Sequence, residues 1–564
     1  MKKEIILYCL LSFYLFAREL PIAFEGNNFI KESELYNAIG LEKPYFYEFW
    51  KKTPVLDTKS INLAVKRLKF FYKVKGFYHA FITVKVDKKY IKFIIKKGKP
   101  VIINSISVIS KFDLSPYIPF KKGDIFRVDS FKKSKQEIKN FYKNKGYCKV
   151  DLDAKAWIDI DKNRAYLAYD VRANPLCHFG NIKIIKPKDI DSKIIQSFLS
   201  FKKGDLYSLR RIKESYDNLY AQSGISNVLI TTNMQEGFDV NTTVKVDETK
   251  KPMRFQSGLG INSDKGLEIS LRVGHKNFYG DLKTVTFGIK HNRFKDSIAS
   301  AINIPLQDKR STGSTLEFSN EDFLGYKEKK ISPTIYLKQR SGKTITKETL
   351  LINYSKISGS NDLATYKNGD FFILSPKFSW IYDSRDDPLE PTMGHFLKVE
   401  IEASIKSIIS DASYYKYTLE AAKIFPLQSS VIALKVNYNS LHTIDGNLPA
   451  SYRFYAGGME SNRAYNYRKL GPANRAGDPI GLNSTLGITT EYRFKIYDNI
   501  GGVLFNDNTF IGLKEVPDFD KIYSCIGFGF RYKTPIGPIA LDFGFDAKRP
   551  LKQYAIHFRI GELF

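Results

Sequence analysis

From residue 254 to the end of the chain, apolar residues alternate with polar or glycine residues in segments of about ten. Leu397, Val399 and Ile401, for example, alternate with Lys398 and Glu400. Successive side chains of a strand point to opposite faces, so the pattern gives each strand one apolar face. After residue 17 the sequence has no run of the roughly 18 apolar residues that a spanning helix needs. We therefore predict that residues 254–564 form a transmembrane β-barrel.

The alternating segments number sixteen, and bacterial barrels have an even number of strands. They cover residues 254–262, 265–276, 282–292, 296–305, 312–320, 331–340, 346–357, 370–383, 394–406, 412–424, 430–442, 485–495, 501–511, 521–533, 536–546 and 553–564. The connection 443–484 is much longer than the others and contains YRFYAGGMESNRAYNYRKLGP. Its adjacent glycines, arginines and tyrosines indicate a specific role for this loop.

The first residues have the pattern of a secretory signal. Lys2 and Lys3 precede an apolar run from Ile5 to Phe16, and Ala17 follows it. The run is too short for a spanning helix, so we predict a cleavable signal peptide over residues 1–17. Together with the barrel, it places the protein in a Gram-negative outer membrane.

Between the leader and the barrel, one pattern occurs three times. The segments FFYKVKG, NFYKNKG and NLYAQSG end at Gly76, Gly146 and Gly224, spaced by 70 and about 80 residues. FKKGD precedes the second and third copies, and WKKTP takes its place in the first. Each copy has the predicted order β-α-α-β-β, and its second helix stops at a glycine suited to a left-handed cap.

This order resembles the POTRA domain of periplasmic transport proteins. We expect three POTRA domains, over residues 18–99, 100–174 and 175–253. The predicted fold class is α+β periplasmic repeats followed by an all-β, sixteen-stranded antiparallel barrel.

Three repeats and such a barrel resemble the BamA/TamA family of outer-membrane assembly factors, and the repeat count favours TamA. That family carries an Arg-Gly-Tyr/Phe signature in its sixth external loop. Here Arg463 and Tyr465 match the signature and follow Gly457 and Gly458. Ala464 replaces the central glycine, and alanine disfavours the positive φ that glycine would allow in a tight turn there.

The resemblance implies a role for Arg463. In the family the loop folds into the lumen, and its arginine contacts an acid of the inner wall. Asp507 in LFNDNTF is the first candidate partner, although Thr509 replaces a family glycine, and Asp542 is the second. A guanidinium cannot lose its charge, so inside a barrel it requires such a carboxylate.

Two further motifs support the resemblance. FSWIYDSRDDPLEPTMGHFLKVEIE resembles the family's Asp-Ser-Arg-Asp turn between strands eight and nine. We expect an ion network of Asp383, Arg385 and Asp386 there, in a connection shaped by Pro388 and Gly394. A hairpin rich in Asp, Pro and Gly could also arise without this role.

The chain ends IHFRIGELF, similar to the terminal strand by which outer-membrane proteins are recognised. Gly258 and Gly260 weaken the first strand, and Gly561 and Phe564 lie at the end of the last. We expect a lateral gate between these two strands.

The mature cysteines are Cys148, Cys177 and Cys525. Three thiols allow at most one bridge; a Cys148–Cys177 bridge is open, but small buried hydrophobes are the favoured interpretation.

The net charge of +29 accompanies abundant Lys, Asn, Ile, Phe and Tyr, so we read it as compositional drift and expect no nucleic-acid partner. Docking on anionic lipid remains an alternative.

We expect no enzyme, cofactor or metal. The seven histidines are dispersed, and no His-Glu-x-x-His or Gly-x-Ser-x-Gly occurs. The resemblance implies a factor that inserts or exports β-barrel and autotransporter-type clients, with unfolded clients, a TamB-like partner and outer-membrane lipids as candidate partners. The alternative is a two-partner-type secretion pore or a passive porin.

Overall fold

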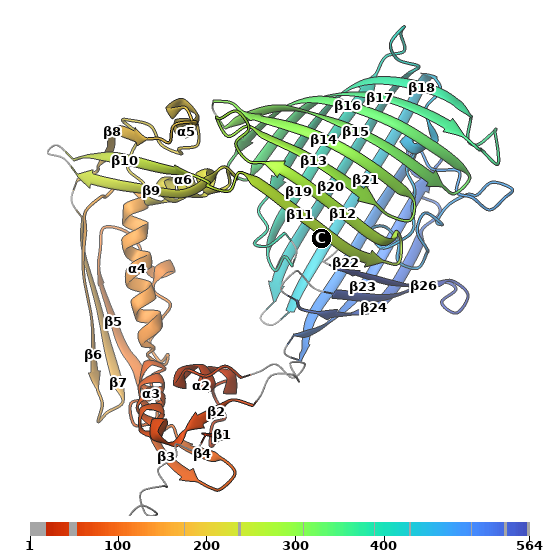
Figure 1. Ribbon diagram of the computed structural model, residues 1–564. Coiled ribbons are helices and arrows are strands. Elements are labelled where there is room, and N and C mark those ends of the chain that lie inside the picture. The colour runs from red at the N-terminus through yellow and green to blue at the C-terminus, as the bar shows by residue number, and fades with distance from the viewer. Residues whose placement is uncertain are drawn as a thin grey trace, which may run out of the picture. The chain divides into compact units, whose positions relative to one another are not determined.

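The computed structural model describes residues 19–43, 53–173, 175–234, 238–307, 309–388, 390–427, 430–497, 499–534 and 539–560 (Figure 1). The predicted leader, residues 1–17, lies outside these ranges, as do Gly561 and Phe564. Across the described ranges, no helix combines the length and apolar character needed to cross a membrane.

The C-terminal part forms one antiparallel sheet of sixteen strands that pair in sequence order from β11 to β26 (Figure 1). The strands are β11 (Met253–Asn262), β12 (Gly266–His275), β13 (Thr284–His291), β14 (Lys295–Pro305), β15 (Arg310–Phe323), β16 (Tyr326–Ser341), β17 (Thr344–Ser358), β18 (Gly369–Asp383), β19 (Gly394–Ser404), β20 (Ala412–Leu427), β21 (Ser430–Gly446), β22 (Ser484–Tyr497), β23 (Ile500–Gly512), β24 (Tyr523–Tyr532), β25 (Ile539–Asp546) and β26 (Tyr554–Ile560). All sixteen predicted segments are confirmed as strands. Their described ends shift by up to five residues, and the predicted ends 536–538 and 561–564 lie outside the described residues.

Strand β24 shows how the sequence pattern becomes two faces. Ile526, Phe528 and Phe530 are exposed, as expected of side chains that face lipid. Cys525 and Arg531, which alternate with them, are buried inside the barrel. The inner wall can therefore carry charged groups without exposing them to hydrocarbon.

The first repeat contains β1 (Glu19–Glu25), α2 (Glu32–Ile39), β2 (Val55–Asp57), the 3₁₀-helix η1 (Thr58–Ser60), α3 (Ile61–Val74), β3 (Phe81–Val86) and β4 (Ile91–Lys96). Its sheet has the order β2-β1-β4-β3, so β2 is a short strand that the sequence pattern did not predict. Helix α3 buries Ala64, Leu68 and Tyr72, one every four residues, in a core shared with Phe93 of β4.

The second repeat contains β5 (Ile102–Ile109), the 3₁₀-helix η2 (Ser115–Tyr117), α4 (Val128–Asn144), β6 (Val150–Asp159) and β7 (Arg164–Ala173), with sheet order β5-β7-β6. The predicted first helix is wrong here, because a single 3₁₀ turn with Pro116 replaces it. The predicted second helix is confirmed as α4, which buries Phe131, Ile138 and Tyr142.

A third unit has the same order of elements. It contains β8 (His178–Ile185), α5 (Ser192–Ser197), α6 (Leu209–Tyr220), β9 (Ile225–Met234) and β10 (Asp239–Glu248), with sheet order β8-β10-β9. The limits of the three domains, at 99/100, 174/175 and 253/254, remain predictions.

The three repeated glycines end their helices differently. Gly76 and Gly146 have φ of 96° and 104°, the predicted left-handed conformation. The prediction is wrong for Gly224, which has no positive φ, because α6 already ends at Tyr220. A Cβ on Gly224 would lie 2.8 Å from a side-chain carbon of Leu282, so close packing explains this glycine.

All three glycines also form a backbone hydrogen bond with the segment that follows their repeat. Their carbonyls accept hydrogen bonds of 2.9 Å from the backbone N–H groups of Val101, Cys177 and Thr249, respectively. These contacts fix where each following segment starts.

A disulfide joins Cys148 to Cys177, with 5.8 Å between the Cα atoms. The favoured interpretation of both residues as free, buried hydrophobes is therefore wrong. Cys148 follows α4 closely and Cys177 directly precedes β8, so the end of one helix and the start of the next repeat are brought together. Cys525 is free and buried.

Candidate functional site

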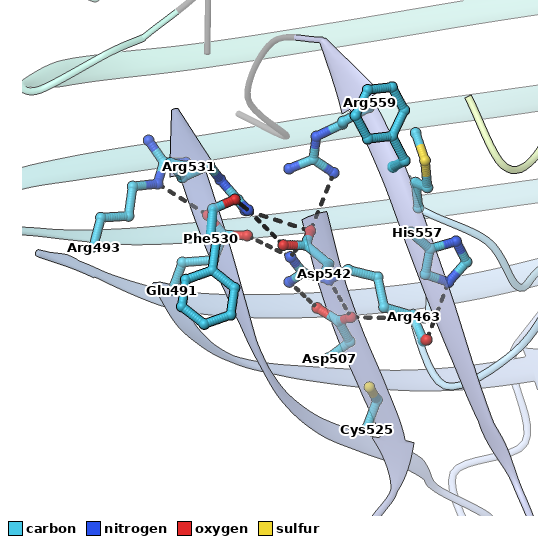
Figure 2. A network of polar contacts seen from close by, with 12 residues as sticks. Arg463, Glu491, Arg493, Asp507, Cys525, Phe530, Arg531, Asp542, His557 and Arg559 are labelled. Carbon is cyan, nitrogen blue, oxygen red and sulfur yellow. Dashed lines mark hydrogen bonds and ion pairs between the residues drawn. The ribbon is translucent and has the colours of Figure 1, made fainter. Parts of the chain in front are cut away.

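The long connection between β21 and β22, residues 447–483, lies against the inner wall of the barrel. Arg463 in this connection is fully buried, with 0% of its surface exposed. In Figure 2 its guanidinium points into a group of acidic side chains. We call Arg463 and the carboxylates of Glu491, Asp507 and Asp542 the latch.

Within the latch, every guanidinium nitrogen of Arg463 donates a hydrogen bond to a carboxylate. Nε donates to Oδ2 of Asp507 at 2.9 Å and Nη2 to Oδ1 at 2.8 Å, a bidentate pair. Nη1 donates to Glu491 at 2.7 Å and to Asp542 at 3.3 Å. The backbone N–H of Arg463 also donates to Asp507, at 3.1 Å. Both expected partners therefore contact Arg463, with Asp507 the principal one.

Strand alternation puts the three acids on one surface. Glu491 lies on β22, Asp507 on β23 and Asp542 on β25, and each points inward. Phe505 precedes Asp507 by two residues and shares its face. Its ring centroid lies 3.4 Å from the guanidinium carbon of Arg463, so the cation is held between an aromatic face and three carboxylates.

Three further arginines surround the acids (Figure 2). Arg493 lies 2.9 Å from Glu491, whereas Arg531 and Arg559 lie 2.5 and 3.7 Å from Asp542. Asp507 differs, because Arg463 is its only cationic partner among the described residues. Removing Arg463 would leave the buried Asp507 carboxylate without a countercharge.

The residues around Arg463 complete the docking. Tyr465 donates from its hydroxyl to Asp546 at 2.8 Å, and Asn462 donates to Thr509 at 3.3 Å. Thr509, the replacement for a family glycine, thus binds the loop. Ala464 is fully buried and has no positive φ, so alanine fits here without strain.

Gly457 and Gly458 do need the left-handed conformation, with φ of 97° and 100°. A Cβ on Gly458 would lie 2.6 Å from Oδ2 of Asp264, which follows β11. The next residue, Met459, donates its N–H to that same oxygen at 2.9 Å. These glycines bring the loop onto the first hairpin of the barrel.

Gly544 in β25 allows the loop to approach the wall. A Cβ there would lie 2.2 Å from the carbonyl oxygen of Arg463 and 2.4 Å from its carbonyl carbon. Only a residue without a side chain leaves this space free.

We expect Gly544→Ala to push the loop away and to destabilise the folded protein by about 1–3 kcal/mol, the usual cost of overpacking. Urea unfolding in detergent and proteolysis of residues 447–483 would measure both effects. Gly487→Ala is the matched control, because a Cβ at Gly487 in β22 would meet no atom within 4 Å. Equal effects of the two changes would refute the role of Gly544.

The loop is also held on the other side of the lumen. Tyr452 accepts at its hydroxyl from Asn353 of β17, at 2.7 Å, and at its carbonyl from Lys416 of β20, at 2.9 Å. Tyr366 donates to the carbonyl of Pro479 at 2.6 Å. The loop therefore contacts walls far apart in the sheet order.

A cavity of about 1070 Å³ lies between the loop and strands β11 and β12. Gly258 and Gly260 line it, as do Glu268 and Arg272. The predicted gate glycines thus face the lumen.

The seam between β11 and β26 differs from every other strand pair of the barrel. In the described part of both strands no β-ladder joins them, and they are the two ends of the sheet order. The backbone N–H of Ser263 reaches the carbonyl of Phe558 at 3.4 Å. Gly258 and Gly260 are fully paired with β12, so the weakness lies at the edge of β11 facing β26.

The motif at 383–394 forms the turn between β18 and β19. Arg385 donates to both oxygens of Asp383, at 3.0 and 2.8 Å. The expected network is wrong for Asp386, which does not join this ion pair. Asp386 instead accepts hydrogen bonds from the backbone N–H groups of Thr392 and Met393, at 2.9 and 3.1 Å, and from the Thr392 hydroxyl. Partial desolvation raises the pKa of Asp386, but the hydrogen bonds from Thr392 and Met393 outweigh it and lower the pKa to about 2.

The other two residues of this motif have different roles. Gly394 has φ of 115°, and a Cβ there would lie 2.5 Å from the carbonyl of Ser384. Pro388 is exposed in the turn.

Sequence reasoning missed Glu491, Gly544 and His557, which all contact the loop. Glu491 and His557 are polar residues at the lumen-facing positions of predicted strands. The alternation of the strands could therefore have identified them as residues of the inner wall. Gly544 had no such signal, because the close approach of the loop is a tertiary contact.

Comparison with known proteins places these features in a family context. Residues 240–564 match the Omp85 superfamily domain, and residues 21–98 and 99–174 match the POTRA surface antigen variable number repeat. The outer membrane protein assembly factor BamA of Nitratidesulfovibrio vulgaris strain Hildenborough is 21% identical over 585 residues, which cover 96% of this chain and 73% of that protein.

Two solved structures align with most of this chain, and the first of them shares its fold. The crystal structure of BamA from Haemophilus ducreyi lacking POTRA domains 1–3 has a TM-score of 0.58 at 17% identity, covering 82% of this chain and 99% of that one. CdiB from Acinetobacter baumannii has a TM-score of 0.48 at 15% identity, covering 82% and 89%. The expected resemblance and fold class are confirmed, whereas the third POTRA domain and the particular similarity to TamA remain predictions.

Proposed function

Because the chain belongs to the Omp85 superfamily, we propose that it inserts or exports β-barrel and autotransporter-type client proteins through a lateral gate at the seam between β11 and β26. Its barrel lies in the outer membrane and its POTRA repeats lie in the periplasm. Assembly or secretion of outer-membrane proteins is the general activity of this kind of barrel, and the gate, the clients and the TamA-like role are our proposal.

The physical problem is the unpaired strand edge. In hydrocarbon each unpaired backbone N–H or C=O costs several kcal/mol, so a client strand cannot enter without a partner. A barrel whose first and last strands separate can lend its own edges as that partner.

The observation that carries the proposal is the missing ladder between β11 and β26. Every other neighbouring pair in the sheet is joined by an antiparallel ladder, including the pairs that contain a bulge. The exposed Phe255, Leu259 and Ile261 give β11 an apolar outer face, so its edge could pair with a client strand within the bilayer. The latch braces the wall from β22 to β25 behind this seam.

The POTRA repeats would receive clients first. We assign them to residues 18–99, 100–174 and 175–253, the third by its order of elements. Strand β5 is an edge of its sheet and borders a groove of about 780 Å³ lined by Val108, Phe112 and Phe120. An extended client could add to such an edge by backbone hydrogen bonds, which suits many sequences. A TamB-like partner and outer-membrane lipids belong to the same proposal.

Reconstitution separates this function from a passive porin or a secretion pore. Proteoliposomes that contain the full chain should accelerate the membrane insertion of an unfolded test β-barrel, measured by its protease-protected fraction. Steady ion conductance without accelerated insertion would favour a pore. Depletion in cells, with quantification of outer-membrane proteins and phospholipids, would identify the clients.

A further inference from the structure

A closed ring of contacts joins the loop, the last strand and the first hairpin. His557 of β26 places Nε2 3.1 Å from the carbonyl oxygen of Arg463, which Figure 2 draws as a dashed line. Its Nδ1 lies 3.2 Å from the hydroxyl of Ser263 and 3.3 Å from Oδ1 of Asp264. The other oxygen of Asp264 accepts from the N–H of Met459. Met459 precedes Arg463 by four residues, so the ring closes through the loop.

Burial makes these contacts specific. His557 is 2% exposed, Asp264 8% and Arg463 0%. A carbonyl oxygen can only accept, so Nε2 of His557 must carry a hydrogen and donate it to Arg463. A buried group that loses such a partner has little water to replace it. Displacing one member of the ring is therefore costly for its neighbours in the ring.

We propose that His557 is a positioning residue that couples the docking of the loop to the closure of the seam. The ring is a main link between β11 and β26 in the part of the chain that the structure describes, because no ladder joins these strands. The backbone of Arg463 is fixed by the latch, and His557 carries that position to Ser263 and Asp264. Release of the loop therefore loosens the seam, and opening of the seam loosens the loop.

This inference concerns the barrel itself. Its importance for clients rests on the proposed function, but the coupling can be measured without any client.

Cysteines at Ile261 and Ile560 would report on the seam. Strands β11 and β26 are antiparallel, as the first and sixteenth strands of the sheet, and Ser263 contacts Phe558. Continuing this register by two residues sets Ile261 opposite Ile560, and both are exposed on the outer face. The initial rate of oxidative cross-linking in the full chain, with Cys525→Ser, then measures how often the seam is closed.

His557→Ala should lower the cross-linking rate about 5- to 30-fold, the effect of losing one or two buried contacts. Arg463→Ala should lower it similarly, although its side chain does not touch β11. The double variant should show no further loss, because both changes break the same ring.

His557→Asn separates coupling from simple packing. The shorter amide reaches Ser263 and Asp264 as Nδ1 does, but falls short of the Arg463 carbonyl. We expect cross-linking in this variant to fall about as far as in Arg463→Ala, because both changes break the contact with the Arg463 carbonyl, and we expect no additional effect of Arg463→Ala in its background. A histidine that only fills space would not make the response to Arg463→Ala depend on residue 557.

His291→Ala is the control, because His291 pairs with Asp296 on strands away from the seam and should leave the rate unchanged. Rates are compared on the folded, heat-modifiable band, so loss of folding is counted separately. Unchanged cross-linking in Arg463→Ala, or independent, multiplying effects of Arg463→Ala and His557→Ala, would overturn the coupling. If the coupling holds but client insertion persists with a locked seam, the proposed function fails and this inference stands.

Discussion

Replacing Arg463 with alanine is expected to destabilise the barrel by about 3–5 kcal/mol, because it leaves the buried Asp507 carboxylate without its countercharge. Asp507 loses its bidentate partner, and neither Arg493 nor Arg531 reaches it in the structure. Urea unfolding in detergent micelles would measure the stability, and the reconstituted insertion assay would measure the loss of activity. The stability of Arg463→Lys should lie between that of the unchanged protein and that of Arg463→Ala, since a point charge cannot bind both oxygens of Asp507.

Two comparisons test the cause of this effect. Arg475→Ala removes an exposed arginine of the same loop and should change stability by less than about 0.5 kcal/mol. Adding Asp507→Asn to Arg463→Ala should recover part of the lost stability, because the uncompensated charge is then removed. An equal loss from Arg475→Ala, or no recovery in the double variant, would contradict the electrostatic explanation.

The barrel was predictable because hydrocarbon enforces a period of two. Each spanning strand must show lipid an apolar face, so Ile526, Phe528 and Phe530 reveal both the strand and its orientation. The long loop was equally visible, because Gly457, Gly458 and Arg463 are unusual residues for a solvated connection. Asp507 and Asp542 were predicted from the resemblance, and both contact Arg463.

Features that depend on contacts between residues distant in the sequence were harder to predict from the sequence. Gly224 had the sequence context of a helix cap, yet α6 ends earlier and Leu282 occupies the space beside it. Asp386 was predicted to join an ion network, but its carboxylate accepts hydrogen bonds from nearby backbone N–H groups instead. The pairing of Cys148 with Cys177 depends on how the second repeat meets the start of the third, which no local pattern encodes.

Cross-linking the seam is expected to abolish client insertion without unfolding the protein. A disulfide between Ile261→Cys and Ile560→Cys would hold β11 and β26 together, provided their Cα atoms lie within the roughly 4.4–6.8 Å that such a bond spans. If clients enter between these strands, the oxidised protein should insert no more test barrel than protein-free liposomes do. Reduction should restore insertion.

The matched control is a disulfide of the same kind elsewhere in the wall. Ile335 of β16 pairs with Leu350 of β17, and both side chains are exposed on the outer face. A bond between cysteines at these positions rigidifies the barrel and undergoes the same redox treatment, which also acts on Cys148 and Cys177, but leaves the seam free. It should therefore insert clients at the normal rate. Full activity in the protein locked at 261 and 560 would show that clients do not pass between β11 and β26, whereas equal loss in both locked proteins would show that the barrel must deform as a whole.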